Sequence, residues 1–176
     1  MPTEERTRVI TLIALFRSAT QLMVDELIAR LHAAGYTEIT AAQHLVFENI
    51  DPDGTRLTTL GQRAGISRQS VTELVTALQR NGYLELRTDP SDRRARLVCL
   101  TRQGKAQVRR AIAEIAAIEA DWQESFARAG LDTDARDLIR NAIDEHAAMN
   151  RTTPPSDRRR LTNVTPDGGE RKPVPE

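Results

Sequence analysis

The chain of 176 residues lacks the features that define several classes of protein. It has one cysteine, Cys99, so an intramolecular disulfide framework is excluded. No apolar run approaches the ~20 residues that a membrane-spanning helix needs. The N-terminal sequence MPTEERTR mixes acidic and basic residues and does not resemble a signal peptide. We therefore expect a cytoplasmic protein with no membrane segment, built as one domain with additional elements.

Motifs of catalysis and metal binding are also missing from the sequence. It contains no Gly-x-Ser-x-Gly nucleophile turn and no phosphate-binding loop. His32, His44 and His146 are scattered and show no metal-ligand spacing. We expect no enzymatic activity, no metal and no cofactor.

The formal net charge is zero, but the charges are unevenly distributed along the chain. Residues 56–110 hold twelve basic and four acidic side chains, a net charge of +8, and the segments on either side carry −4 each. A phosphate backbone responds to the local field, so this basic segment favours a nucleic-acid partner. All basic residues except Lys105 and Lys172 are arginine, which is typical of GC-rich bacterial genomes.

Residues 58–82 have the pattern of a helix-turn-helix. A short helix, Thr59 to Ala64, is followed by a turn that contains Gly65 and by Ser67, whose hydroxyl can cap a second helix. Apolar residues recur at helical spacing in that second helix, which ends at Asn81-Gly82. Its buried face is predicted to hold Val71, Leu74, Val75 and Leu78.

A short hairpin is predicted after this motif. Tyr83–Arg87 and Arg94–Leu100 have the alternation of strands, and Asp89-Pro90-Ser91-Asp92 between them has turn chemistry. Arginines would project from its tip and descending strand. A polar helix end beside such a hairpin suits duplex DNA, with the helix in the major groove and arginine in the minor groove.

Longer helices are predicted on both sides of this region. One spans about residues 5–34; Thr40 and Gln43 form a capping box that opens another, to about Glu48. Further helices span about 102–128 and 133–148, the second capped by Asp132 or Thr133. The predicted organisation is an N-terminal dimerisation helix (1–35), a winged helix-turn-helix domain (36–101), C-terminal dimerisation helices (102–148) and a disordered tail (149–176).

This order predicts a mainly α (α+β) fold, a winged helix-turn-helix domain with long N- and C-terminal helices. A single winged-helix domain would leave the apolar surfaces of those helices largely exposed. The same surface of a second chain would cover them in a two-fold dimer, which would present two recognition helices to a palindromic operator. The basic run Arg158–Arg160 of the tail is either a further DNA contact or part of a tail without function.

These residues resemble the MarR family of bacterial transcriptional regulators. The resemblance covers about residues 5–148, and its most specific part is the wing sequence DPSDRRARLV at 89–98 with Leu100-Thr101 and Gly104 after it. Further matches are Ile39–Gln43, Gly65–Ser70 and Asn81–Leu84. The resemblance implies a homodimeric, sequence-specific regulator of double-stranded DNA, usually a repressor released by a small ligand or by oxidation. The alternatives are a winged-helix module for protein contacts and a thiol-based redox sensor that uses Cys99.

The match and the geometry together assign roles to particular side chains. Arg68 is expected to contact guanine or phosphate and Gln69 adenine, with a surface salt bridge as the alternative for Arg68. Arg94 is expected to enter the minor groove, oriented by a charge-assisted bond from Asp92. Thr58 and Thr59 either contact the DNA backbone or cap their helix. The full set of predicted DNA-binding residues is Thr58, Thr59, Ser67, Arg68, Gln69, Ser70, Thr72, Asp92, Arg93, Arg94 and Arg96.

A small apolar or phenolic effector is expected between the dimerisation helices and the winged-helix domain. Phe16, Tyr36 and His44 are its candidate contacts, with core packing as the alternative for each. Some relatives sense peroxide through a cysteine in the first helix, but this chain has none there. Cys99 is therefore interpreted as a structural thiol or, alternatively, as a sensor at a different position.

Overall fold

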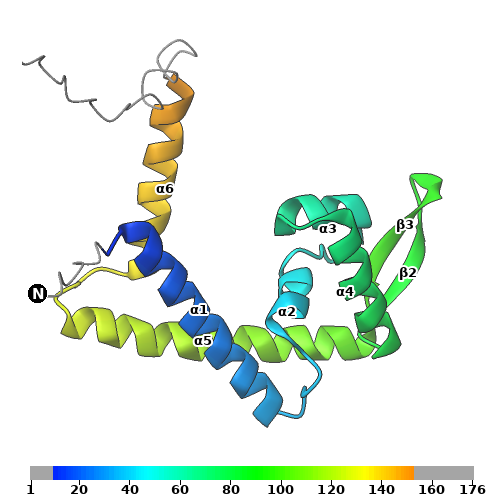
Figure 1. The fold of residues 1–176 in the computed structure, drawn as a ribbon, viewed down its shortest axis with the longest axis horizontal. Helices are drawn as coiled ribbons and strands as arrows, with labels where there is room; N and C mark the ends of the chain where they lie inside the picture. The colour runs from blue at the N-terminus through cyan, green and yellow to red at the C-terminus, as the bar shows by residue number, and fades with distance from the viewer. Residues whose placement is uncertain (1–9, 153–176) are drawn as a thin grey trace, which may run out of the picture. The chain divides into compact units, whose positions relative to one another are not determined.

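The computed structural model describes residues 10–152, which form six helices and three strands. The chain divides into two compact units after Trp122. The elements, drawn in Figure 1, are α1 (Leu12–Ala33), α2 (Ala41–Glu48), β1 (Thr55–Arg56), α3 (Leu57–Ala64), α4 (Arg68–Arg80), β2 (Leu84–Asp89), β3 (Asp92–Leu100), α5 (Arg102–Arg128) and α6 (Ala135–Thr152). This arrangement confirms the mainly α fold with a small antiparallel sheet.

Helix α1 begins later than the sequence indicated. The Thr11 side chain accepts a hydrogen bond from the Ala14 amide and caps the helix, so Leu12 is its first residue. The first part of the predicted span 5–34 falls on residues 1–9, outside the described residues. After Ala33 the chain passes through Gly35, whose φ of +94° is a conformation that L side chains rarely adopt. The predicted stop at this glycine is confirmed.

Helix α2 opens with the predicted capping box. Thr40 accepts a bond from the Gln43 amide at 3.2 Å, and the Gln43 side chain accepts one from the Thr40 amide at 3.0 Å. The turn that follows is closed by a bond from the Gly54 amide to the Asp51 carbonyl. This turn delivers the chain to β1, a strand of only two residues.

The three strands form an antiparallel sheet in the order β1-β3-β2. Strand β1 pairs with β3 only at Thr55–Val98 and Arg56–Leu97, whereas β2 pairs with β3 along its length, from Leu84–Leu100 onward. The outer part of the β2–β3 hairpin therefore has no third strand, and in Figure 1 it projects away from α4 as the wing.

The core of the first unit is centred where the helices of the motif meet the base of the sheet. Phe47 and Tyr83 pack edge to face, with ring centroids 6.1 Å apart. The amide of Thr101 donates to the carbonyl of Tyr83, and this bond fixes the start of α5 against the end of α4. The largest fully buried side chains are Leu31, Ile39, Val46, Leu60, Val71, Leu78, Val98, Gln107 and Ile118.

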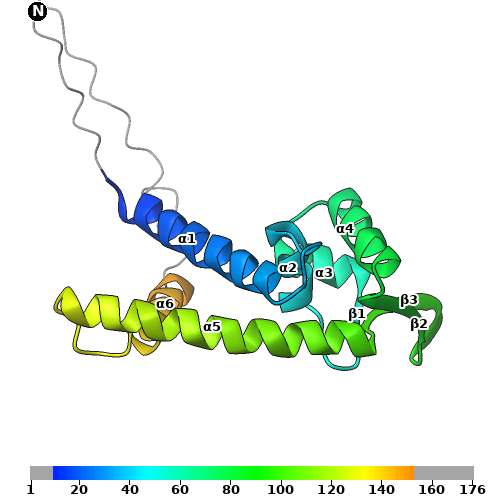
Figure 2. The same ribbon diagram turned by 90° about the horizontal axis from the view of Figure 1, so that it is seen from below.

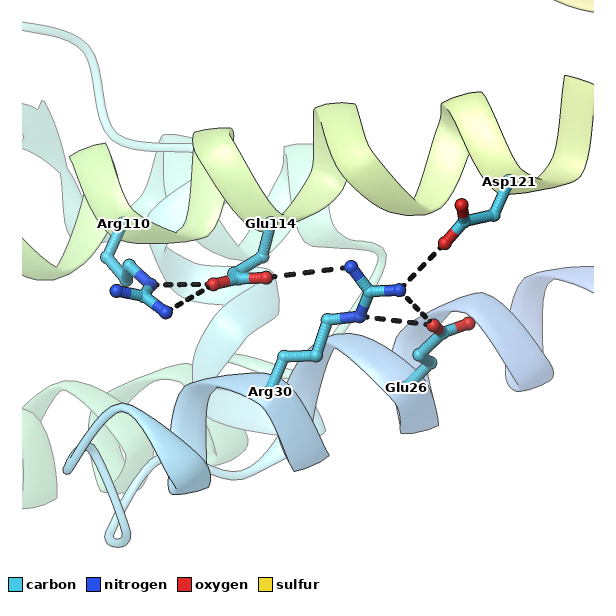
Figure 3. A network of polar contacts seen from close by, with 5 residues as sticks. All are labelled: Glu26, Arg30, Arg110, Glu114 and Asp121. Carbon is cyan, nitrogen blue, oxygen red and sulfur yellow. Dashed lines mark hydrogen bonds and ion pairs between the residues drawn. The ribbon is translucent and has the colours of Figure 1, made fainter.

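Helix α1 crosses the middle of α5, as Figures 1 and 2 show. Arg30 of α1 connects the two helices: its guanidinium lies 2.9 Å from Asp121 and 3.7 Å from Glu114 of α5, and it also bonds Glu26 of its own helix. Arg110 completes this network by pairing with Glu114 (Figure 3). Large apolar side chains are exposed elsewhere on α1, with Ile13 at 81%.

In the second unit the cap of α6 differs from the prediction. Asp134, not Asp132 or Thr133, accepts bonds from the amides of Arg136 and Asp137, so the helix begins at Ala135. Gln123 receives the Ala135 amide and donates to the Thr133 carbonyl, which holds the preceding loop in place. The helix continues to Thr152, beyond the predicted end at 148. The predicted disordered tail and its run Arg158–Arg160 otherwise lie outside the described residues.

No helix within residues 10–152 is both long and apolar enough to cross a membrane.

Candidate nucleic-acid interface

Helix α4 has one buried and one exposed face. Ser67 caps it as predicted, accepting a bond from the Ser70 amide at 3.0 Å. Val71, Val75 and Leu78 are buried, as their spacing indicated. The exposed side chains on the opposite face are Arg68, Gln69, Thr72, Glu73 and Thr76. This polar face is short, and it starts at the N-terminal end of the helix.

Most polar groups on this face are engaged within the helix. Gln69 donates to the Glu73 carboxylate at 3.0 Å, and the Thr72 hydroxyl donates to the Arg68 carbonyl at 2.6 Å. The Ser67 and Ser70 hydroxyls lie 2.8 Å apart. The guanidinium of Arg68, by contrast, pairs with no side chain of residues 10–152. Its predicted alternative, a surface salt bridge, is therefore not observed among those residues.

The structure corrects the interpretation of Thr58 and Thr59 as helix caps. Helix α3 begins at Leu57 with Arg56 in the capping position, and no side chain caps its first turn. Thr58 and Thr59 are thus the second and third residues of the helix, with Thr58 exposed and Thr59 partly buried. The first amides of α3 have no helical partner, a condition that favours anions at a helix start.

The wing turn is held by two aspartates with separate roles. Asp89 accepts bonds at one oxygen from the Ser91 amide (2.8 Å) and hydroxyl (2.6 Å), and at the other from Arg56 Nε (2.8 Å). Asp92 accepts the backbone amide of Arg94 at 3.0 Å. The predicted charge-assisted bond from Asp92 to the Arg94 side chain is not formed: Asp92 bonds the backbone amide of Arg94 instead.

The arginines of the motif fall into two groups. Arg56, Arg63 and Arg87 are paired with Asp89, Asp51 and Glu85, respectively. Arg96 donates to the Thr88 hydroxyl at 3.1 Å. The guanidiniums of Arg68, Arg93 and Arg94 meet no acceptor in the described part of the chain. Arg80, exposed in the last turn of α4, meets no acceptor there either, so the unpaired charge of the motif lies at both ends of α4 and at the tip of the wing.

Two carboxyl groups have pKa values that reflect these pairs. The bonds from the Ser91 hydroxyl and amide and from Arg56 lower the pKa of Asp89 to about 2. A hydrogen bond from Arg63, with a second from Thr55, lowers the pKa of Asp51. Both groups are charged at neutral pH, so both pairs persist there.

Sequence reasoning missed two residues of this region. Glu73 places a carboxylate on the exposed face of α4, and helical spacing from Gln69 was the signal that could have found it. Arg56 was not among the predicted site residues, whereas its side chain reaches the wing turn. Nothing local predicts that contact, because 33 residues separate Arg56 from Asp89.

The three candidate effector residues do not form one site. His44 is 5% exposed and lines a cavity of about 140 Å³. Tyr36 packs against Tyr83 with ring centroids 6.5 Å apart, and Phe16 is half exposed on α1. Neither lines the cavity, so the structure separates them from His44. The cavity is lined by Met23, Val24, Leu27, His44, Glu48, Ile115 and Ile118.

His44 is the main polar group of this cavity. Its Nε2 lies 3.1 Å from a carboxylate oxygen of Glu48, and hydrogen bonding to His44 lowers the pKa of Glu48. Its Nδ1 has no hydrogen-bond partner within residues 10–152. Apart from His44 and Glu48 the lining is apolar, with residues from α1, α2 and α5 around the cavity.

Cys99 lies in β3 and is 5% exposed. Its sulfur is covered by the turn at Gly54, where an added Cβ would lie 2.5 Å from Sγ. The thiol is thus shielded by the chain that leads into β1.

Comparison with known proteins relates these features to a family. Residues 37–95, which span α2 to the wing, match the sequence profile of the MarR family. This part of the chain is similar to the MarR family of winged-helix transcriptional regulators. No curated protein matched the chain.

Solved structures of MarR-type proteins share the fold over most of their length. CouR from Rhodococcus jostii RHA1, bound to p-coumaroyl-CoA, is 19% identical, with 77% of this chain and 91% of CouR covered at a TM-score of 0.63. The transcriptional repressor CouR bound to a 23-mer DNA duplex is 25% identical, with 78% and 92% covered at 0.59. BpsR of Bordetella bronchiseptica, whose DNA binding is regulated by 6-hydroxynicotinic acid, is 24% identical, with 84% and 98% covered at 0.57.

Proposed function

We propose that this chain is a MarR-type repressor that binds a palindromic operator as a homodimer and is released by a small ligand. The observation that supports the DNA-binding part is that Arg68 at the start of α4 and Arg93 and Arg94 at the tip of the wing meet no acceptor among residues 10–152. Arg68 contacts guanine or phosphate, and Arg94 enters the minor groove. Gln69 reads adenine after exchanging its bond to Glu73 for one to the base.

The other predicted residues position the protein on the duplex. Arg93 and Arg96 meet phosphates, and Thr58 and Thr59 approach the backbone at the start of α3, where free amides add to the attraction. Ser67, Ser70 and Thr72 lie on the same groove-facing end of α4, and Asp92 holds the backbone of the wing. Phosphate contacts of this kind supply affinity, while base contacts supply the choice of sequence.

The homodimer is supported by the apolar surface of α1. Large exposed apolar residues are unusual in such number on one helix of a soluble chain, and they mark an interaction surface. The residues concerned are Leu12, Ile13, Leu15, Phe16 and Leu22 of α1, and Ile10 just before the helix adds to them. A two-fold partner would cover this surface and bring a second α4 to the next half-site. Helix α6 also exposes apolar side chains, at Leu138, Ile139, Ile143 and Met149.

Release by a ligand is supported by the cavity beside His44. Its volume of about 140 Å³ is close to the ~150 Å³ of an engineered cavity that binds benzene, so one aromatic ring would fill it. The free Nδ1 of His44 can bond a single polar substituent. CouR is bound to p-coumaroyl-CoA, and the DNA binding of BpsR is regulated by 6-hydroxynicotinic acid; each of these molecules carries a hydroxylated six-membered aromatic ring. We propose a small phenolic or related aromatic effector.

The DNA-binding proposal is tested with a duplex selected by the protein from a random library. Arg94→Ala is expected to weaken binding to that duplex by about ten-fold or more, since a good base contact supplies ~1–3 kcal/mol. Arg128→Ala is the matched control, because it removes an exposed arginine outside the motif that pairs with Glu124. Affinity is measured by fluorescence anisotropy at several salt concentrations.

Three results would contradict the DNA-binding proposal. They are failure to enrich any sequence, affinity that does not fall as salt rises, and equal losses for Arg94→Ala and the control. Salt-independent binding would instead favour a protein partner. The effector proposal is tested separately: a phenol that fills the cavity should lower operator affinity for wild type and not for His44→Leu.

A further inference from the structure

The wing is tied to the helix-turn-helix by one side chain that crosses the sheet. Arg56 ends β1 and is also the capping residue of α3, so its backbone belongs to the helix-turn-helix. Strand β3 separates β1 from β2. The Arg56 guanidinium nevertheless reaches Asp89 at the outer end of β2, with Nε at 2.8 Å and Nη2 at 2.6 Å from Oδ2.

This contact falls where the hairpin lacks other support. Strand β1 pairs with β3 no farther out than Leu97, so the ribbon beyond that point consists of two strands. A two-stranded ribbon is only marginally stable on its own and twists easily. Arg93 and Arg94 lie at its tip, where a small rotation of the ribbon produces the largest displacement.

Asp89 is built into the turn as a fixed point. It is only 6% exposed, and both of its oxygens are occupied, one by Ser91 and one by Arg56. Burial of a charged carboxylate is unfavourable unless partners compensate it, so the site depends on Arg56. Arg56 Nη2 also lies 3.9 Å from Asp92, the residue that bonds the Arg94 amide. One guanidinium therefore faces the carboxylates on both sides of the turn.

We propose that Arg56 and Asp89 are positioning residues for DNA binding: their bridge sets the angle of the wing relative to α4, so that Arg94 reaches the minor groove when α4 occupies the major groove. This inference rests on the proposed function. It assigns to Arg56 an indirect role, in which the arginine acts on DNA through the wing and not by direct contact.

A direct role for Arg56 makes the opposite prediction, which allows a sharp test. Arg56 is partly exposed, and if it bound phosphate, removal of the Asp89 charge would release it and tighten binding. In the positioning role the same change loosens the wing and weakens binding. Asp89→Asn therefore separates the two roles by the sign of its effect on affinity.

The experiment uses the duplex that wild-type protein selects from a random library. Asp89→Asn and Arg56→Ala are each expected to weaken binding about ten-fold, a loss similar to that of one base contact. Asp51→Asn is the matched control: it removes a carboxylate paired with another arginine of the motif, Arg63, and changes the net charge equally. The control is expected to bind at least as tightly as wild type.

Two further measurements identify the wing as the route of the effect. In the Arg94→Ala background, Asp89→Asn should lower the affinity for the duplex by less than about two-fold, because the DNA contact of Arg94 that Asp89 positions is already absent. Hydroxyl-radical cleavage of the duplex should lose protection in the flanking minor groove and keep it in the central major-groove region. As a separate check on the bridge itself, Arg56→Lys should recover part of the affinity that Arg56→Ala loses.

Several outcomes would overturn the inference. Tighter or unchanged binding by Asp89→Asn would do so. A ten-fold loss of affinity that Asp89→Asn still causes in the Arg94→Ala background would do so as well. If the melting curve shows that Asp89→Asn does not fold, Arg56→Ala replaces it, because this variant retains the bonds between Asp89 and Ser91. Unchanged binding by Arg56→Ala, or a ten-fold loss that persists in the Arg94→Ala background, would then overturn the inference. Wild-type protein that selects no sequence would remove the proposed function itself, whereas normal selection with unaffected variants would remove only the positioning role.

Discussion

Gly104, the third residue of α5, packs against the backbone of Tyr83, which follows α4. A Cβ added at Gly104 would overlap the carbonyl oxygen of Tyr83 and would lie 3.2 Å from both the Tyr83 carbonyl carbon and Leu100 Cδ2. The Tyr83 carbonyl cannot easily move away, because the Thr101 amide bonds it at 3.0 Å and the Thr101 hydroxyl bonds it at 3.1 Å. Gly104→Ala is therefore expected to destabilise the fold.

The size of the effect follows from two opposing terms. Alanine is favoured over glycine in a helix by up to ~1 kcal/mol. Insertion of a methyl group into a packed site costs ~1–3 kcal/mol, and a fixed backbone obstacle places Gly104 at the upper end of that range. The expected net loss is about 2 kcal/mol, or a decrease in melting temperature of about 4–8 °C for a chain of this length.

Gly61→Ala is the matched control, since Gly61 is also buried within a helix of the motif. An added Cβ there would lie 3.4 Å from the Ile66 carbonyl oxygen and from Val71 Cγ1, which is ordinary contact. This variant should be as stable as wild type or up to ~1 kcal/mol more stable. Urea unfolding followed by circular dichroism, at one fixed protein concentration, measures both variants. Equal midpoints for the two variants would refute the argument from backbone contact.

Three other predictions concern charge and assembly. Because the folded pKa of Asp89 is about 2 and its ordinary value is 3.8, its bonds stabilise the fold fully above the ordinary value and lose that contribution as pH falls toward 2. The stability difference between wild type and Asp89→Asn should thus be constant above pH ~5 and shrink below pH ~4 in urea titrations; a constant difference down to pH 2 would contradict this. If the proposed homodimer forms through α1, Ile13→Glu should dissociate it in sedimentation velocity, whereas the same charge placed on α4 by Thr76→Glu should leave it intact. A dimer that survives Ile13→Glu would argue against α1 as the interface. Arg93→Ala should reduce the slope of log affinity for DNA against log salt concentration by about one per half-site, and Arg63→Ala should leave this slope unchanged. Equal slopes for the two variants would contradict the division between paired and unpaired arginines.

The helices were predictable wherever spacing and end signals agreed. Helix α5 occupies the predicted span 102–128, because its apolar stripe is regular and Gly130 follows it with φ +96°. The capping box at Thr40 and Gln43 and the cap at Ser67 are local motifs, and both formed as expected. Each of these predictions depends on residues within a few positions of one another, where the chain has few alternatives.

The errors arose where several similar residues competed for one role. Asp132, Thr133 and Asp134 can all cap a helix, and the bonds of Gln123 to the preceding loop favour the last of them. Asp89 and Asp92 both flank the wing turn, and sequence alone does not show which carboxylate faces which arginine. The cavity beside His44 was unpredictable for a related reason. Its apolar lining is part of ordinary helical stripes, and the space between them depends on how three helices pack.

The arginines of the motif show why total charge is a poor guide to its binding surface. The segment 56–110 carries +8, but a guanidinium that faces a carboxylate contributes little to the field that a phosphate experiences. Arg56, Arg63 and Arg87 are paired and can serve to hold the backbone in place. Arg68, Arg93 and Arg94, which meet no acceptor among residues 10–152, lie on the two elements that the proposal assigns to successive grooves. The same residue type thus has a structural or a binding role depending on whether the fold brings an acidic side chain within reach, and in this protein long-range contacts such as Arg56–Asp89 make that choice.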